Sequence, residues 1–64
     1  MEELVYRVFL DNGFSSLNRR EFNVSYRTLY HMAQQGYLVR HDLPEYVTLT
    51  EVGEERANLY VNSN

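Results

Sequence analysis

The sequence contains no cysteine, which excludes a disulfide framework and any metal site built on thiolates. Its two histidines, His31 and His41, have no neighbouring metal-ligand residues, so we expect no metal and no cofactor. An enzyme would need a nucleophile with a base, or a pair of carboxylates beside a pocket. Because the Ser, His and Asp residues already have ordinary places in caps, loops and surfaces, we also expect no catalytic residue and no small-molecule ligand.

Long hydrophobic runs are absent as well. No stretch approaches the roughly 20 apolar residues that a membrane span requires, and the acidic Glu2 and Glu3 carry the wrong charge for a signal peptide. No long Ser, Gly, Pro or Gln tract indicates disorder. The sequence, 44% of it hydrophobic, therefore predicts a single globular domain over residues 1–64, and we expect it in the cytoplasm.

Positive charge is scarce, since the formal net charge is −3 and all six basic residues are arginines. Taken alone, an acidic chain argues against nucleic acid, because phosphate repels it. The charge is segregated, however. Residues 14–41 hold four arginines against one glutamate, a balance of +3, and the remainder holds two arginines against eight acidic residues, a balance of −6. One basic face can therefore form, although genome composition or a salty cytoplasm explains the use of arginine equally well.

Apolar residues recur at helical spacing in four segments, and two β-rich runs surround a short connection that contains the single proline. The predicted helices cover about residues 2–12, 16–22, 25–35 and 51–61, and the predicted hairpin covers about 37–49. Gly13 and Gly36 stand where left-handed residues often end helices. The candidate N-caps are Ser15 or Ser16 for the second helix, Asn23 or Ser25 for the third, and Thr50 for the fourth. The chain is expected to be mostly α-helical with a small β-hairpin.

Two sequence blocks link the predicted hairpin to the helices beside it. Residues 32–39, MAQQGYLV, close a helix with polar residues, a glycine, a leucine and a valine, and residues 46–57, YVTLTEVGEERA, contain tyrosine, leucine-threonine, glycine and alanine in order. These blocks resemble the end of the recognition helix, and the passage from wing to last helix, in MarR-type and PadR-type transcriptional regulators. The resemblance implies a winged helix-turn-helix, whose third helix enters the major groove of double-stranded DNA. The short wing departs from that pattern by carrying Asp42 and Glu45.

The third predicted helix would carry the residues that read DNA. Its outer face holds Arg27, His31 and Gln34 at helical spacing. Arginine pairs with guanine and glutamine with adenine in the major groove, although any solvated helix face shows such residues. His31 is expected to be exposed, and its protonation would add charge on binding.

Other polar residues are candidates for phosphate contacts. Ser25, Tyr26 and Tyr30 can donate hydroxyl groups to phosphate oxygens, although both tyrosines fit equally well at the edge of the core. Arg19 and Arg20 on the second predicted helix would meet the DNA backbone.

The wing supplies two further candidates, Arg40 and His41, which would lie near phosphate if the hairpin touches DNA. The alternative is an ion pair of Arg40 with Asp42 or Glu45 across the tight loop.

The sequence is compatible with two functions. The first is a homodimeric transcriptional regulator that reads two half-sites, because one module of this size buries little surface. Its dimer contact would come from the terminal helices, through the apolar residues Leu4, Val8, Leu59, Tyr60 and Val61. The second is a winged helix that binds another protein, as an adaptor, an anti-repressor or an assembly subunit, through acidic ends and exposed tyrosines.

Overall fold

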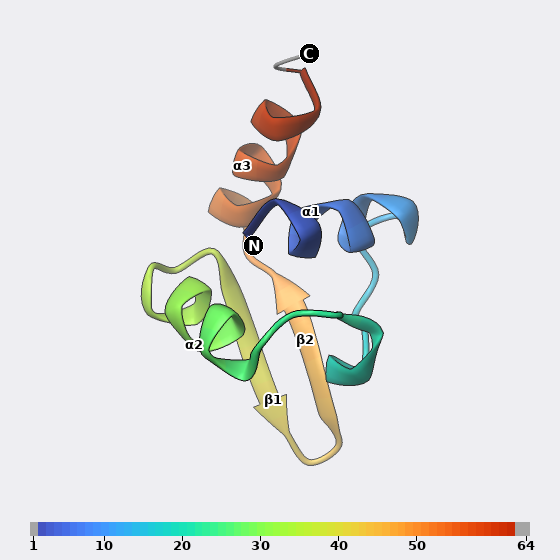
Figure 1. The fold of residues 1–64 in the computed structure, drawn as a ribbon, viewed down its shortest axis with the longest axis vertical. Helices are drawn as coiled ribbons and strands as arrows, with labels where there is room; N and C mark the ends of the chain where they lie inside the picture. The colour runs from blue at the N-terminus through green and yellow to red at the C-terminus, as the bar shows by residue number, and fades with distance from the viewer. Residues whose placement is uncertain (1, 63–64) are drawn as a thin grey trace.

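The computed structural model describes residues 2–62, and the side chains of residues 2–60. The elements in chain order are α1 (Glu2–Asp11), the 3₁₀ turn η1 (Arg19–Glu21), α2 (Tyr26–Gln34), β1 (Leu38–Asp42), β2 (Glu45–Leu49) and α3 (Glu51–Asn62). The two strands form an antiparallel hairpin that projects from the helices, with its turn at the end of the molecule opposite α3 (Figure 1). The expected fold class, mostly α-helical with a small β-hairpin, is confirmed.

A single apolar core joins all of these elements except η1. The buried residues are Val5, Tyr6, Phe9, Phe22, Leu29, Met32, Leu38, Val47 and Ala57. The rings of Phe9 and Phe22 lie with their centroids 5.1 Å apart, which ties α1 to the segment that follows η1. Full burial of one large apolar side chain stabilises a fold by about 1.5–3 kcal/mol, so these residues supply the main driving force for folding.

The predicted helix over residues 16–22 is wrong. Leu17 is extended and forms a β-bridge with Val47, donating its amide to the Val47 carbonyl at 3.0 Å and accepting at 2.7 Å in return. Only the three residues of η1 turn, and their N-cap is Asn18, whose side chain accepts from the Arg20 amide at 2.9 Å, rather than either of the two serines that the sequence suggested. A third extended segment therefore lies beside β2, and this bridge fixes where η1 begins.

The other predicted caps agree with the structure. Ser25 caps α2 by accepting from the Thr28 amide at 3.4 Å, and Gly36 follows the helix with a φ of +83°. The Thr50 hydroxyl accepts from the Gly53 amide at 3.0 Å and donates to the Gly36 carbonyl at 2.6 Å. Thr50 therefore caps α3 and also ties its start to the loop that ends α2.

Successive side chains along each strand of the hairpin point to opposite faces. The register pairs Leu38 with Leu49 and Arg40 with Val47, so these side chains share the face that packs on the core. His41 lies one residue after Arg40 and points to the opposite face. A cis peptide bond joins Leu43 to Pro44 in the turn.

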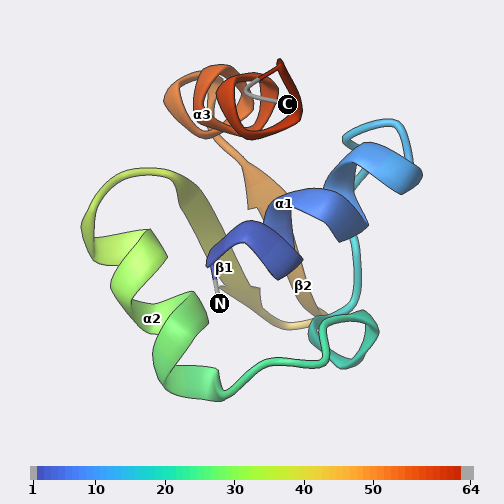
Figure 2. The same ribbon diagram turned by 45° about the horizontal axis from the view of Figure 1, so that its top comes forward.

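The α1 and α3 helices pack together at the other end of the molecule (Figure 2). Glu2 accepts from Arg56 Nε at 2.6 Å and from the Tyr6 hydroxyl at 2.9 Å, and the rings of Tyr6 and Tyr60 lie 5.3 Å apart. Burial and the hydrogen bond to Glu2 raise the pKa of Tyr6 above its ordinary value. Within residues 2–62, no helix combines the length and the apolar character needed to cross a membrane.

Candidate nucleic-acid interface

Tyr26, the first residue of α2, lies at the centre of a cluster of cationic side chains. The Cζ atom of Arg19 lies over its ring at 4.4 Å from the centroid, and the Cζ atom of Arg40 lies over it at 4.3 Å. Arg40 also lies 5.8 Å from the centroid of Tyr30, one turn further along the helix. We call Arg19, Tyr26 and Arg40 the Tyr26 cluster; it joins η1, α2 and β1, which are distant in sequence.

The backbone pairings of one hairpin residue, Val47, position both arginines. Val47 in β2 pairs with Arg40 on one side and with Leu17 on the other. The first pairing puts Arg40 on the face toward α2, and the second fixes the start of η1, which carries Arg19. The cluster is therefore built by strand pairing, not by the exposed loops alone.

Among the described side chains, no carboxylate pairs with the arginines of the cluster. The ion pairs found among the described side chains are Arg7 with Glu3 and Arg56 with Glu2, both on α1 and α3. The first turns of α1 and α3 each carry two glutamates, whereas the first turn of α2 carries none. A cation over an aromatic ring gains about 0.5–1 kcal/mol at an exposed site, and the ring leaves its charge uncompensated. The arginines are thus held in place while they keep their capacity to bind an anion.

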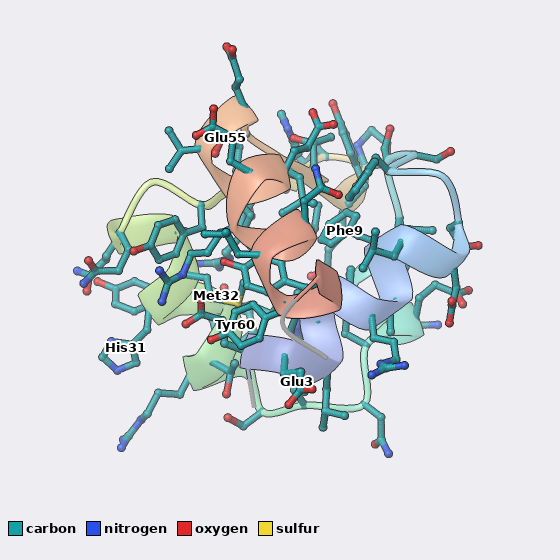
Figure 3. The ribbon with its side chains drawn as sticks, turned by 90° about the horizontal axis from the view of Figure 1, so that it is seen from above. Glu3, Phe9, His31, Met32, Glu55 and Tyr60 are labelled. Carbon is teal, nitrogen blue, oxygen red and sulfur yellow. The ribbon has the colours of Figure 1, made fainter. Side chains whose placement is uncertain are left out.

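The outer face of α2 is exposed, as the sequence predicted. Arg27, His31 and Gln34 are all solvent-exposed, while Met32 on the opposite side is buried. His31 projects outward from α2 in Figure 3. The Gln34 side-chain amide donates to the Tyr30 hydroxyl at 3.2 Å, so these two polar groups orient each other. The helix therefore offers a polar row that is continuous with the Tyr26 cluster.

No family model, curated protein or solved structure matches this chain.

The structure separates the two candidates in the wing. His41 stacks on Tyr46 with ring centroids 4.0 Å apart and an interplanar angle of 4°, and its Nε2 lies 3.3 Å from Thr48 Oγ1. It therefore lies on the hairpin face away from the Tyr26 cluster. Among the described side chains, Arg40 makes no ion pair with Asp42 or Glu45, because its guanidinium turns toward α2 instead.

The remaining candidates border the cluster. Arg20 and Ser25 are exposed and adjoin Arg19 and Tyr26 in sequence, and the Ser25 hydroxyl also lies 3.2 Å from Thr28 Oγ1. Asn18 is a contributor that sequence reasoning missed: its side chain caps η1 and donates to the Glu45 carbonyl at 3.3 Å, linking η1 to the hairpin. The sequence signal for this cap is an asparagine, a residue type favoured at N-caps, directly before Arg19 and Arg20.

The apolar residues suggested for a dimer contact fall into two groups. Leu4 and Leu59 are 49% and 68% exposed, whereas Val8 and Tyr60 are half-buried and pack against the core. The side chain of Val61 lies outside the described residues. On the described parts of the terminal helices, the exposed large apolar side chains are Leu4, Leu59 and Val52, the last of which was not among the residues suggested from the sequence.

Proposed function

We propose that this chain binds double-stranded DNA as a small transcriptional regulator with a winged helix-turn-helix fold. The observation that carries the proposal is the convergence of Arg19 and Arg40 on Tyr26 without any described carboxylate partner. Two cations brought together from different elements favour an anion of high charge density, and the phosphate backbone of DNA is such a partner. Phosphate contacts of this kind position a protein on the duplex.

The α2 helix supplies the base-reading surface in this proposal. It lies next to the Tyr26 cluster and exposes Arg27 and Gln34, whose side chains match guanine and adenine edges in the major groove. A good bidentate pair is worth about 1–3 kcal/mol of discrimination against the wrong base. Arg20, Ser25 and Tyr30 stand at the border of this surface, where they would contact backbone phosphates.

A homodimer completes the proposal, because one short helix reads too few base pairs to be specific. Two copies would place their α2 helices in successive major grooves, about 34–36 Å apart along the duplex. The outer surfaces of α1 and α3 are left for the contact between copies, and such a regulator would act in the cytoplasm. Footprints of two symmetric half-sites are the expected signature.

The test is a titration of a fluorescently labelled pool of duplexes, followed by anisotropy over a range of salt concentrations. The double variant Arg19→Gln with Arg40→Gln should bind more weakly than the native chain. The slope of log K against log salt should also fall by about 0.9 for each lost phosphate contact. Arg19→Gln and Arg40→Gln are also measured singly and compared with Arg7→Gln, which likewise removes one positive charge, because Arg7 is an exposed arginine on α1, outside the proposed interface.

The outcomes separate DNA from protein recognition. Equal loss of affinity in Arg7→Gln and in each single variant would mean that net charge, not the Tyr26 cluster, governs binding. Absence of binding at low salt would overturn the proposal. It would favour the alternative of a winged helix that binds another protein.

A further inference from the structure

The turn of the hairpin is poorly suited to contact with a DNA groove. Asp42 and Glu45 are exposed and stand directly opposite each other in the strand register. Like charges in that arrangement repel each other, and they also repel the negative potential of a narrow minor groove. Between them Leu43 is 98% exposed. Nothing basic stands at the tip to offset these carboxylates.

The arginine of the hairpin is directed elsewhere. Arg40 is half-buried on the core-facing side of β1, and its guanidinium lies over the ring of Tyr26 in α2. A wing that entered the minor groove would need a cation at its tip, whereas this cation is held two residues before Asp42 and points back toward the helices. The positive charge of the hairpin therefore lies beside the first residue of α2.

The two arginines are close enough to act on one stretch of DNA strand. Each Cζ atom lies within 4.4 Å of the same ring centroid, so the two are separated by less than twice that distance. A guanidinium that donates to a phosphate oxygen at about 2.8 Å places its Cζ about 4 Å from the phosphorus. Arg19 and Arg40 can therefore reach phosphates that lie close together on one strand. The ring of Tyr26 holds them together without neutralising either charge.

We propose that the Tyr26 cluster is a preassembled clamp for the phosphate backbone of one DNA strand, and that the hairpin supports this clamp while its tip stays outside the minor groove. This inference rests on the proposed DNA binding and specifies how the wing takes part in it. Tyr26 is a positioning residue for the two arginines. DNA contact is then confined to α2, η1 and the middle of β1.

The position of the tip is tested with single-tryptophan variants, since the chain contains no tryptophan of its own. Leu43→Trp places the fluorophore at the hairpin tip, and His31→Trp places it on the exposed face of α2. Acrylamide quenching is measured for each variant with and without a saturating random-sequence duplex, at low salt. Duplex should protect the α2 fluorophore by at least twofold and leave the tip fluorophore as accessible as in the free chain.

Each result of that experiment is decisive. Protection of the tip fluorophore to the same degree as the α2 fluorophore would place the wing in a groove and overturn the inference, while the proposed function would stand. Anisotropy of the labelled duplex is recorded in parallel, and failure of both variants and the native chain to bind would overturn the proposed function itself. The two failures are therefore distinguishable.

A mutant cycle on the same duplex tests the clamp. Arg19→Gln and Arg40→Gln should each weaken binding on the order of threefold to tenfold, and the double variant should lose less than the product of the two factors, because either loss opens the clamp. Tyr26→Leu should weaken binding without changing the charge, whereas Tyr26→Phe keeps the ring and should bind within about twofold of the native chain. Far-ultraviolet circular dichroism confirms that each variant is folded. Multiplicative arginine effects together with native-like binding by Tyr26→Leu would show that the arginines act independently.

Discussion

Replacing Gly53 with alanine tests the closest approach between two parts of the backbone. Gly53 is buried in the first turn of α3, where an added Cβ atom would overlap the carbonyl oxygen of Tyr37 and lie 2.9 Å from Leu49 Cδ2. The same carbonyl accepts a hydrogen bond from the Thr50 amide at 3.1 Å, so it cannot turn away freely. Because the obstacle is backbone, relaxation requires α3 to move away from the segment that leads into β1.

Two opposing effects determine the magnitude. Alanine is favoured over glycine inside a helix by about 1 kcal/mol. Forcing an extra carbon into a filled space costs about 1–3 kcal/mol or more, and loss of the hydrogen bond from Thr50 to Tyr37 adds about 1 kcal/mol. We therefore expect Gly53→Ala to lower the free energy of unfolding by about 1–3 kcal/mol. That is a large share of the roughly 3–10 kcal/mol expected for a chain of this length.

The assay is urea denaturation followed by circular dichroism at 222 nm, at neutral pH. Asn58→Ala is the matched control, because Asn58 is exposed on the same helix and alanine there should raise stability by a few tenths of a kcal/mol. A midpoint for Gly53→Ala equal to or above that of the native chain would refute the close packing of α3 on residue 37.

Three further perturbations have defined outcomes. Burial and the hydrogen bond to Glu2 raise the pKa of Tyr6 above its ordinary value near 10, so above that pH the folded chain keeps a proton that the unfolded chain releases. The stability present below pH 10 should then decline by up to about 1.4 kcal/mol per pH unit, and Tyr6→Phe should flatten this decline in a pH series of urea melts. Thr50→Val removes the cap of α3 and the hydroxyl bond to the loop after α2, and should lower the free energy of unfolding by about 1–2 kcal/mol in the same assay; a native-like midpoint would contradict this. Asp42→Asn combined with Glu45→Gln should raise affinity for duplex DNA by roughly twofold to threefold at low salt and have little effect at about 0.5 M, where charges at the tip are screened; an unchanged affinity at low salt would place the tip far from the duplex.

The helix ends could be predicted from the sequence because their signals act within a few residues. Ser25 and Thr50 accept bonds from amides three residues later, and Gly36 adopts the positive φ that ends α2. Each depends on the chemistry of one side chain and on its immediate neighbours. No knowledge of distant segments is needed for such features.

The segment over residues 16–22 could not be predicted in the same way. A helix of seven residues has little intrinsic stability, so tertiary pairing readily overrides it. Here the backbone of Leu17 is satisfied by Val47, which lies far along the chain. The apolar spacing of the segment fits both a helix and an extended conformation, and only the pairing with β2 decides between them.

The assembly of the Tyr26 cluster could not be predicted from the sequence either. Arg19, Tyr26 and Arg40 are each recognisable as candidates for phosphate contact, yet the sequence does not show that they meet. That result depends on the strand register, which turns Arg40 toward α2 and its neighbour His41 to the opposite face. A register shifted by one residue would exchange their positions.

The distribution of charge explains how a chain of net charge −3 can present a surface for DNA. The acidic residues of α3 lie in its first half, next to the end of the hairpin that is opposite the turn, and the longest dimension of the molecule is 35 Å (Figure 1). Interactions between exposed charges are largely screened beyond about 10 Å at 0.1 M salt, whereas at 0.01 M they extend to about 30 Å. The glutamates of α3 should therefore repel DNA bound at the Tyr26 cluster in dilute buffer and have little influence at 0.1 M.

This reasoning is tested by neutralising two exposed acidic residues of α3. The variant Glu51→Gln with Glu55→Gln should bind duplex DNA more tightly than the native chain at 0.01 M salt and equally well at 0.1 M. For the native chain, the plot of log K against log salt should bend below a straight line at the lowest salt, and the variant should straighten it. A gain of equal size at both salt concentrations would mean that α3 lies within about 10 Å of the bound duplex. Such a result would place the duplex nearer to the end of α2 than to its start, where the Tyr26 cluster lies.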